Sequence, residues 1–242
     1  MSDLHAEKFM EKMAKPGTEE ESFFARRRAL GLGVGVDAEG KPAGSKSLIF
    51  IDFEASSLSP ESWPIEVGIA QLKERRVVVE SKLVQPHGTW PLDDWSDKSA
   101  AVHNIPFSEL ETAMPADEVA HWLIERVGDH ILVSDCPEFD QRWLDRLLST
   151  VNEPVKPEIQ AFDRIAWIAF SREEGVLAPG RIGRVYKTKT NRSTTHRAGA
   201  DAADLAYAFR SGLPKTASPD FLAPMSDEDL HLWEGGDEET GV

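Results

Sequence analysis

The alternation of apolar and polar positions predicts a sheet in the first half of the chain. Residues 48–52 form an almost wholly apolar run, which is typical of a buried strand. Residues 65–72 and 76–84 are also strand-like, and the polar residues 73–75 between them suit a turn. We therefore expect the three segments to form an antiparallel meander.

The second half of the chain is dominated by apolar residues at helical spacing. This periodicity predicts helices over residues 116–127, 140–148, 164–174 and 198–210, and short strands at 131–134 and 158–162. Early strands followed by alternating helices and strands predict one mixed α/β sheet with helices packed against it.

Segments at both ends are expected to lie outside this domain. Residues 1–46 contain a Pro-Gly break and a glycine-rich linker, so they are expected to be an N-terminal extension or arm. From residue 214 onward acidic residues predominate. The predicted organisation is an arm over 1–46, a domain over 47–212 and an acidic tail over 213–242, with the arm or tail available to a homodimer or protein partner.

Charge and composition narrow the possible functions. The net charge of -15 argues against a protein that coats long nucleic acid. One stretch is basic, however: residues 181–197 contain six Lys or Arg and no acidic residue. We interpret this stretch as a charged loop that contacts substrate phosphates through Arg184, Lys187 and Arg192, the alternative being an ordinary solvated surface.

The sequence carries no sign of disulfide chemistry or of a membrane segment. Cys136 is the only cysteine, so an intramolecular disulfide is impossible. No apolar run approaches the roughly 18 residues of a membrane helix, and the first residues are polar and mixed in charge, unlike a signal peptide. We expect a cytoplasmic protein that does not contact a membrane.

Two carboxylates interrupt the first predicted strand. Asp52 and Glu54 are two residues apart, so both side chains project to the same side of the strand. They lie at its C-terminal end, where open α/β sheets place their ligand sites. Adjacent carboxylates repel each other, and a hard divalent cation would compensate them. The alternative is a solvated pair of charges at a strand end.

Three further candidates lie in the helical half. Asp140 shares the inward face of the apolar residues that follow it, although a helix N-cap is the alternative and Asp135 is a rival ligand on the same loop. His196 and Asp201 are five residues apart. They can converge only if His196 lies in the loop before a helix and Asp201 lies one turn inside it.

In chain order, D-x-E on the first strand, F-D in a middle helix and H-x4-D at the last helix resemble the DEDDh branch of the DnaQ-like 3′–5′ exonucleases. "PIEVGIAQL" and "AVHNIPFSEL" are similar to that family's second strand and His-Gly-Ile segment. The resemblance implies a ribonuclease H-like mixed β-sheet flanked by α-helices. It also implies a metal-dependent 3′–5′ exonuclease that hydrolyses phosphodiester bonds at the 3′ end of single-stranded nucleic acid.

The resemblance also implies roles for individual residues. Two divalent cations, Mg²⁺ or Mn²⁺, would be held by Asp52, Glu54, Asp140 and Asp201, and His196 would be the general base. The turn after the first strand contacts the terminal nucleotide in this family, which makes Ser56, Ser57 and Leu58 candidate substrate contacts. His103 is another candidate, with a packing or capping role as the alternative, and Glu66 is expected to be structural.

The substrate and the pathway stay open at this stage. An acidic chain with one basic stretch favours RNA or short oligonucleotides over bulk duplex DNA. A DNA-trimming or proofreading exonuclease is an alternative within the same chemistry. A non-catalytic module that binds nucleic acid or protein on the same fold is an alternative from another class.

Overall fold

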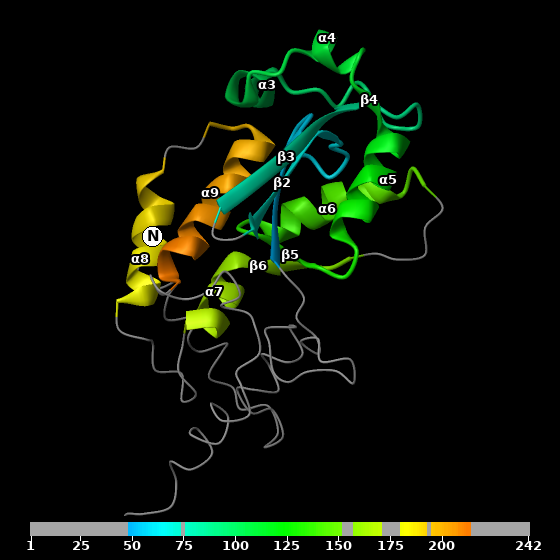
Figure 1. Ribbon diagram of the computed structural model, residues 1–242. Helices are drawn as coiled ribbons and strands as arrows, with labels where there is room; N and C mark the ends of the chain where they lie inside the picture. Colours follow the sequence, from blue (N-terminus) through cyan, green and yellow to red (C-terminus); the bar gives the residue numbers. More distant parts are fainter. Residues whose placement is uncertain (1–47, 74–75, 152–156, 171–179, 193–194, 214–242) are drawn as a thin grey trace, which may run out of the picture.

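The computed structural model describes residues 48–73, 76–151, 157–170, 180–192 and 195–213. These residues include neither the predicted arm over 1–46 nor most of the predicted tail. Any partner contact made through the arm or the tail therefore also lies outside the described residues. The described part of the chain is built around one mixed sheet with helices on both faces (Figure 1). This confirms the predicted fold class.

The sheet has the strand order β4-β3-β2-β1-β5-β6. β1, β2 and β3 pair antiparallel, which confirms the predicted meander, whereas β4, β5 and β6 each lie parallel to a neighbour. β1 is therefore central, between β2 and β5. The strands span Leu48–Ala55 (β1), Pro64–Lys73 (β2), Arg76–Gln85 (β3), Met114–Pro115 (β4), Ile131–Ser134 (β5) and Ile159–Ala161 (β6).

The helices divide between the two faces of the sheet. α5 and α6 cover one face, and α7, α8 and α9 cover the other (Figure 1). None of the described helices is both long and apolar enough to cross a bilayer. The helices span Asp97–His103 (α3), Phe107–Leu110 (α4), Ala116–Val127 (α5), Pro137–Leu148 (α6), Phe162–Phe170 (α7), Arg181–Asn191 (α8) and Ala198–Gly212 (α9).

The period-two alternation of β1 explains why two separate apolar cores form. Ile49, Ile51 and Phe53 point toward α5 and α6 and belong to one buried cluster. Leu48 and Phe50 point to the other side, where they pack with α7 and α9. The next two side chains in that second row are Asp52 and Glu54, so the apolar row ends in carboxylates beside the start of α9.

The helical half differs from the prediction in a few places. The basic stretch is not a loop: most of it forms α8, because Val185 is fully buried against the second core and Tyr186 donates a hydrogen bond to Asp163 at 2.9 Å. α6 begins at Pro137, three residues earlier than expected. Residues 171–174 of the predicted helix over 164–174 lie outside the described residues.

Gly68 allows α9 to lie directly on β2. A Cβ atom at this position would lie 2.1 Å from the backbone carbonyl carbon of Ala198, so any larger residue must displace the helix. We expect Gly68→Ala to lower the free energy of unfolding by about 1–3 kcal/mol, the range for overpacking a tight contact. Gly88→Ala is the matched control, since a Cβ there meets no atom within 4 Å. Equal denaturation midpoints for the two variants would contradict this packing.

Candidate active site

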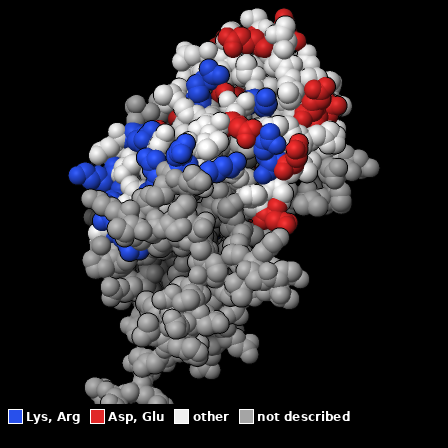
Figure 2. Space-filling view, in the orientation of Figure 1, with Lys and Arg blue, Asp and Glu red and all other residues white. Residues whose placement is uncertain are grey.

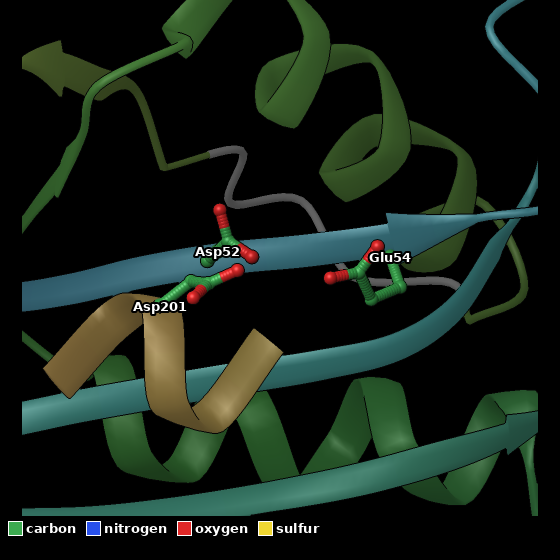
Figure 3. Close-up of side chains that lie close together, drawn as sticks. All are labelled: Asp52, Glu54 and Asp201. Carbon is green, nitrogen blue, oxygen red and sulfur yellow. The ribbon is translucent and has the colours of Figure 1, made fainter. Parts of the chain in front are cut away.

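Three carboxylates meet at the C-terminal end of β1. Asp52 and Glu54 project from the strand, and Asp201 approaches them from the first turn of α9 (Figure 3). One oxygen atom from each residue lies within 4.8 Å of the other two. The cluster thus offers an all-oxygen donor set, which is the kind that hard divalent cations take.

The backbone before α9 brings Asp201 to this position. His196 adopts a left-handed conformation with φ of 50°, Arg197 is extended, and the helix starts at Ala198. The Asp201 carboxylate accepts a hydrogen bond from the backbone N–H of Thr195 at 3.2 Å, which closes the turn. His196 therefore lies in the loop and Asp201 one turn into the helix, which is the arrangement that their spacing required. Left-handed non-glycine residues are uncommon and cluster at functional sites.

Asp140 lies beside the three-carboxylate cluster but outside it. It is 1% exposed, belongs to the first turn of α6 and accepts a short hydrogen bond from the Ser134 hydroxyl. Cys136 is the N-cap residue of α6, so Asp140 is not a cap. Asp135, the rival ligand, is exposed and pairs with Lys189 of α8 at 3.3 Å.

The carboxylates of this site disfavour one another's charge. Burial, and then the negative charges of Asp140 and Glu54, raise the pKa of Asp52 well above its usual value. Burial and the charge of Asp201 raise the pKa of Glu54 to about 8. The pKa values of Asp140 and Asp201 are also raised, mainly by burial. A cation is the natural compensator of such a cluster, so the residues present fit a divalent metal site.

These pKa shifts predict that stability depends on both pH and metal. Between the ordinary Glu54 pKa of 4.5 and the folded value of about 8, the metal-free folded protein binds more protons than the unfolded chain. The stabilisation that the Glu54 carboxyl contributes to the metal-free fold is therefore present at low pH, and it is lost as the pH rises through that window. We expect Tm in Mg²⁺ to exceed Tm in chelator, and we expect this difference to be larger at pH 8 than at pH 5. A rise that is constant or that shrinks toward pH 8 would contradict the carboxylate cluster.

A pocket of about 240 Å³ opens beside Glu54. Its wall includes the apolar side chains of Leu58, Val102 and Trp143, together with His103. His103 is 2% exposed, and its Nδ1 accepts a hydrogen bond from the backbone N–H of Ile105 at 3.0 Å. The proton of the neutral ring therefore lies on Nε2, which is buried and has no hydrogen-bond partner among the described residues. Burial lowers the pKa of His103, which favours this neutral form.

The serines after β1 are buried and take part in the structure of their loop. The Ser56 hydroxyl accepts a hydrogen bond from the backbone N–H of Trp63 at 3.0 Å. The Ser57 hydroxyl donates to Asp94 at 2.8 Å. Ser57 also lines the pocket together with Leu58, whose side chain is 69% exposed. The substrate contacts predicted for Ser56, Ser57 and Leu58 stay predictions, and Leu58 is the most accessible of the three.

The basic residues predicted to bind substrate lie at different distances from the carboxylates. Lys and Arg gather over the α8 side of the molecule (Figure 2). Arg184 donates a hydrogen bond to the backbone oxygen of Ser211 at 3.1 Å. Ser211 lies about 15 Å along α9 from Asp201. Arg192 pairs with Asp204 and stacks on Tyr207, and Lys187 is exposed. Their contacts with substrate stay predictions.

Lys189 is a basic residue of α8 that lies near Asp140 in the fold and that the sequence analysis did not single out. Its Nζ lies 3.3 Å from Asp135, on the loop that leads to Asp140, and its side chain is only 24% exposed. The signal was available in the sequence. Lys189 follows the apolar Val185 by four residues, so a helical reading of the stretch would have placed it on the inward face.

The sheet order, the flanking helices and the carboxylates at the end of β1 together define a ribonuclease H-like α/β protein. Residues 49–209 match the model of the exonuclease family RNase_T, so the chain belongs to this DnaQ-like exonuclease family. This confirms the family resemblance inferred from the three motifs. A comparison with curated proteins found no match.

The comparison with solved structures found similar nuclease chains. Exonuclease I from Methylocaldum szegediense is 13% identical with a TM-score of 0.51, over 73% of this chain and 42% of that one. An E. coli exonuclease I–single-stranded DNA complex with zinc is 16% identical with a TM-score of 0.48, over 68% and 40%. Cell-death related nuclease 4 is 18% identical with a TM-score of 0.45, over 68% and 62%. At these identities the likeness shows the fold alone, and the chain spans about two fifths of the length of the exonuclease I proteins.

Proposed function

We propose that this protein is a metal-dependent exonuclease that removes nucleotides from the 3′ end of single-stranded nucleic acid. The observation that carries this proposal is the meeting of three carboxylate oxygens within 4.8 Å at the edge of a pocket. An isolated acidic cluster is common on protein surfaces. This cluster is partly buried, sits at the end of a central strand and belongs to a chain of the exonuclease family.

Four carboxylates would hold the metal. Asp52, Glu54 and Asp201 would bind one divalent cation, Mg²⁺ or Mn²⁺, and Asp52 with Asp140 would bind a second. Bound divalent cations lower the pKa of water and offset the charge that develops on a phosphate under attack. The buried position of Asp140 and its hydrogen bond from Ser134 fix its carboxylate beside Asp52.

His196 would move the proton in the reaction. In hydrolysis, a water oxygen bonds to the phosphorus while the bond from phosphorus to the 3′ oxygen of the preceding nucleotide breaks. A general base must accept the water proton, and histidine is the side chain used most often. His196 is exposed and lies five residues before the ligand Asp201 in the chain, and the family resemblance gives this histidine the role of general base.

The pocket beside Glu54 would hold the terminal nucleoside. Leu58, Val102 and Trp143 would provide apolar surface for a base or sugar. His103 lies in the wall of the same pocket, with its Nε2 buried behind that surface. Because Glu54 lines this pocket, one terminal unit would occupy the pocket while its phosphate would lie over the metal ligands. Such an arrangement supports attack at the end of a strand. The acidic character of the chain favours RNA or short oligonucleotides as substrates.

The test uses matched RNA and DNA single strands labelled at either end, together with a closed circular single strand. A 3′–5′ exonuclease gives a ladder from the 5′ label, releases the 3′ label as a mononucleotide at once and leaves the circle intact. The polymer that shortens faster identifies the substrate class. Linearised circles would indicate an endonuclease, and intact strands under both metals would favour a binding module.

A further inference from the structure

β2 carries two residues that face the site without being metal ligands. In the pairing of β1 with β2, Glu66 lies opposite Glu54, and Gly68 lies opposite Asp52. Directly opposed residues of an antiparallel pair project to the same face of the sheet. Glu66 and Gly68 therefore lie beside the two carboxylates of β1, under the first turn of α9.

Glu66 is a buried carboxylate that binds the start of α9. It is 3% exposed and accepts hydrogen bonds from Nε and Nη2 of Arg197 at 2.9 and 3.0 Å. It also accepts one from the backbone N–H of Ala198, the first residue of the helix, at 3.1 Å. A two-bond arginine–carboxylate pair fixes orientation as well as distance. The third bond ties the carboxylate to the backbone itself.

Gly68 provides the second half of this attachment. The backbone of Ala198 and Gly199 lies so close that a Cβ atom on Gly68 would be 2.1–2.3 Å from it. The helix start is thus held in two directions, with Glu66 bonding it and Gly68 allowing it to rest on the strand. Since Asp201 is three residues into α9, the contact at Ala198 sets where its carboxylate lies relative to Asp52.

We propose that the Glu66–Arg197 pair is a positioning device for the site, a role that rests on the proposed exonuclease function. Arg197 lies between His196 and Ala198, so the pair fixes the backbone at the point where the left-handed turn becomes helix. It holds the general base on one side and the ligand Asp201 on the other. Arg197 also places a positive charge near Glu54, where it counters the neighbouring carboxylates.

A purely structural ion pair would behave differently from a positioning pair. Nearly half of the Arg197 side chain is accessible, with a relative exposure of 45%, but Glu66 is only 3% exposed. Arg197→Met leaves that buried carboxylate with the Ala198 N–H as its remaining hydrogen-bond donor, whereas Arg197→Lys keeps a positive charge beside it. Arg126 of the Arg126–Glu80 pair between α5 and β3 has a similar exposure of 40%, although Glu80 is 39% exposed where Glu66 is 3% exposed, and this pair involves none of the site residues. Arg126→Met therefore makes the same chemical change at an ion pair away from the carboxylates.

The experiment compares Arg197→Met, Arg197→Lys and Arg126→Met with the wild type in the full chain. Mn²⁺ affinity is measured by electron paramagnetic resonance without substrate, and kcat and KM are measured on a single-stranded oligonucleotide. We expect Arg197→Met to lower Mn²⁺ affinity or kcat by about 10–100-fold, as is usual when a residue that orients a ligand is lost. KM should change little. Arg197→Lys should give intermediate values, because lysine keeps the positive charge but cannot make the two parallel hydrogen bonds of arginine. Arg126→Met should match the wild type.

Wild-type Mn²⁺ affinity and kcat in Arg197→Met would overturn the proposal. If that variant does not fold, Arg197→Lys decides, and wild-type values in it would overturn the proposal equally. The two proposals can fail separately. A wild type that binds Mn²⁺ but shortens no oligonucleotide refutes the exonuclease, while the Mn²⁺ affinities of the variants still test the positioning role.

Discussion

Replacing Asp52 with Asn is expected to abolish hydrolysis and, at the same time, to stabilise the metal-free protein. The two effects have one cause. Asp52 is partly buried among Asp140, Glu54 and Asp201, and its charge is unfavourable there until a cation binds. Asparagine has the same shape without the charge, so the folded protein loses a repulsion and the site loses its central ligand.

The expected sizes of these effects separate a metal site from a chance cluster. A bound metal ion stabilises the transition state by several kcal/mol. Losing its central ligand should therefore lower the rate by about 10³-fold or more. In chelator, Tm of Asp52→Asn should exceed that of the wild type. Adding Mg²⁺ should raise Tm of the variant by less than it raises Tm of the wild type. Asp93→Asn, the same change at an exposed loop residue, is the control. A variant that is less stable in chelator, or that keeps wild-type turnover, would contradict the role given to Asp52.

Replacing His196 with Asn is expected to lower kcat by about 10²–10⁴-fold, the usual contribution of a general base, while metal binding persists. Asparagine is chosen because it tolerates the left-handed backbone of this position and cannot accept a proton near neutral pH. His196 is not among the three clustered ligands, so Mn²⁺ affinity should stay within a few-fold of the wild-type value.

His121→Asn is the matched control, since His121 is exposed on α5, away from the cluster. It should leave kcat and Mn²⁺ affinity unchanged. If His196→Asn loses Mn²⁺ affinity in proportion to kcat, then His196 supports the metal site and is not the base. If it keeps wild-type kcat, another group accepts the proton.

Much of the site was predictable because it depends on local periodicity. The alternation of β1 places Asp52 and Glu54 on one side whatever the rest of the fold does. The five-residue spacing of His196 and Asp201 allows only one arrangement around a helix start, and the structure has it. Asp140 was likewise expected on an inward face, where it is buried.

The contacts that hold the site together were less accessible to such reasoning. Glu66 and Arg197 are 131 residues apart in the chain, and no periodicity links them. The need for glycine at Gly68 arises only because α9 rests on it. Ser57 illustrates the same limit, because its hydroxyl is engaged by Asp94, which is 37 residues away. Pairings of this kind depend on how the elements pack, and only the folded structure defines them.

The central claim is that the carboxylates of β1 and α9 form a cation site that carries out hydrolysis. The most direct measurement is Mn²⁺ binding and oligonucleotide shortening on the same samples of wild type and Asp52→Asn, with and without chelator. We predict saturable Mn²⁺ binding and 3′ shortening in the wild type, and the loss of both in chelator and in the variant. Shortening that continues in chelator, or at the wild-type rate in Asp52→Asn, would contradict the claim.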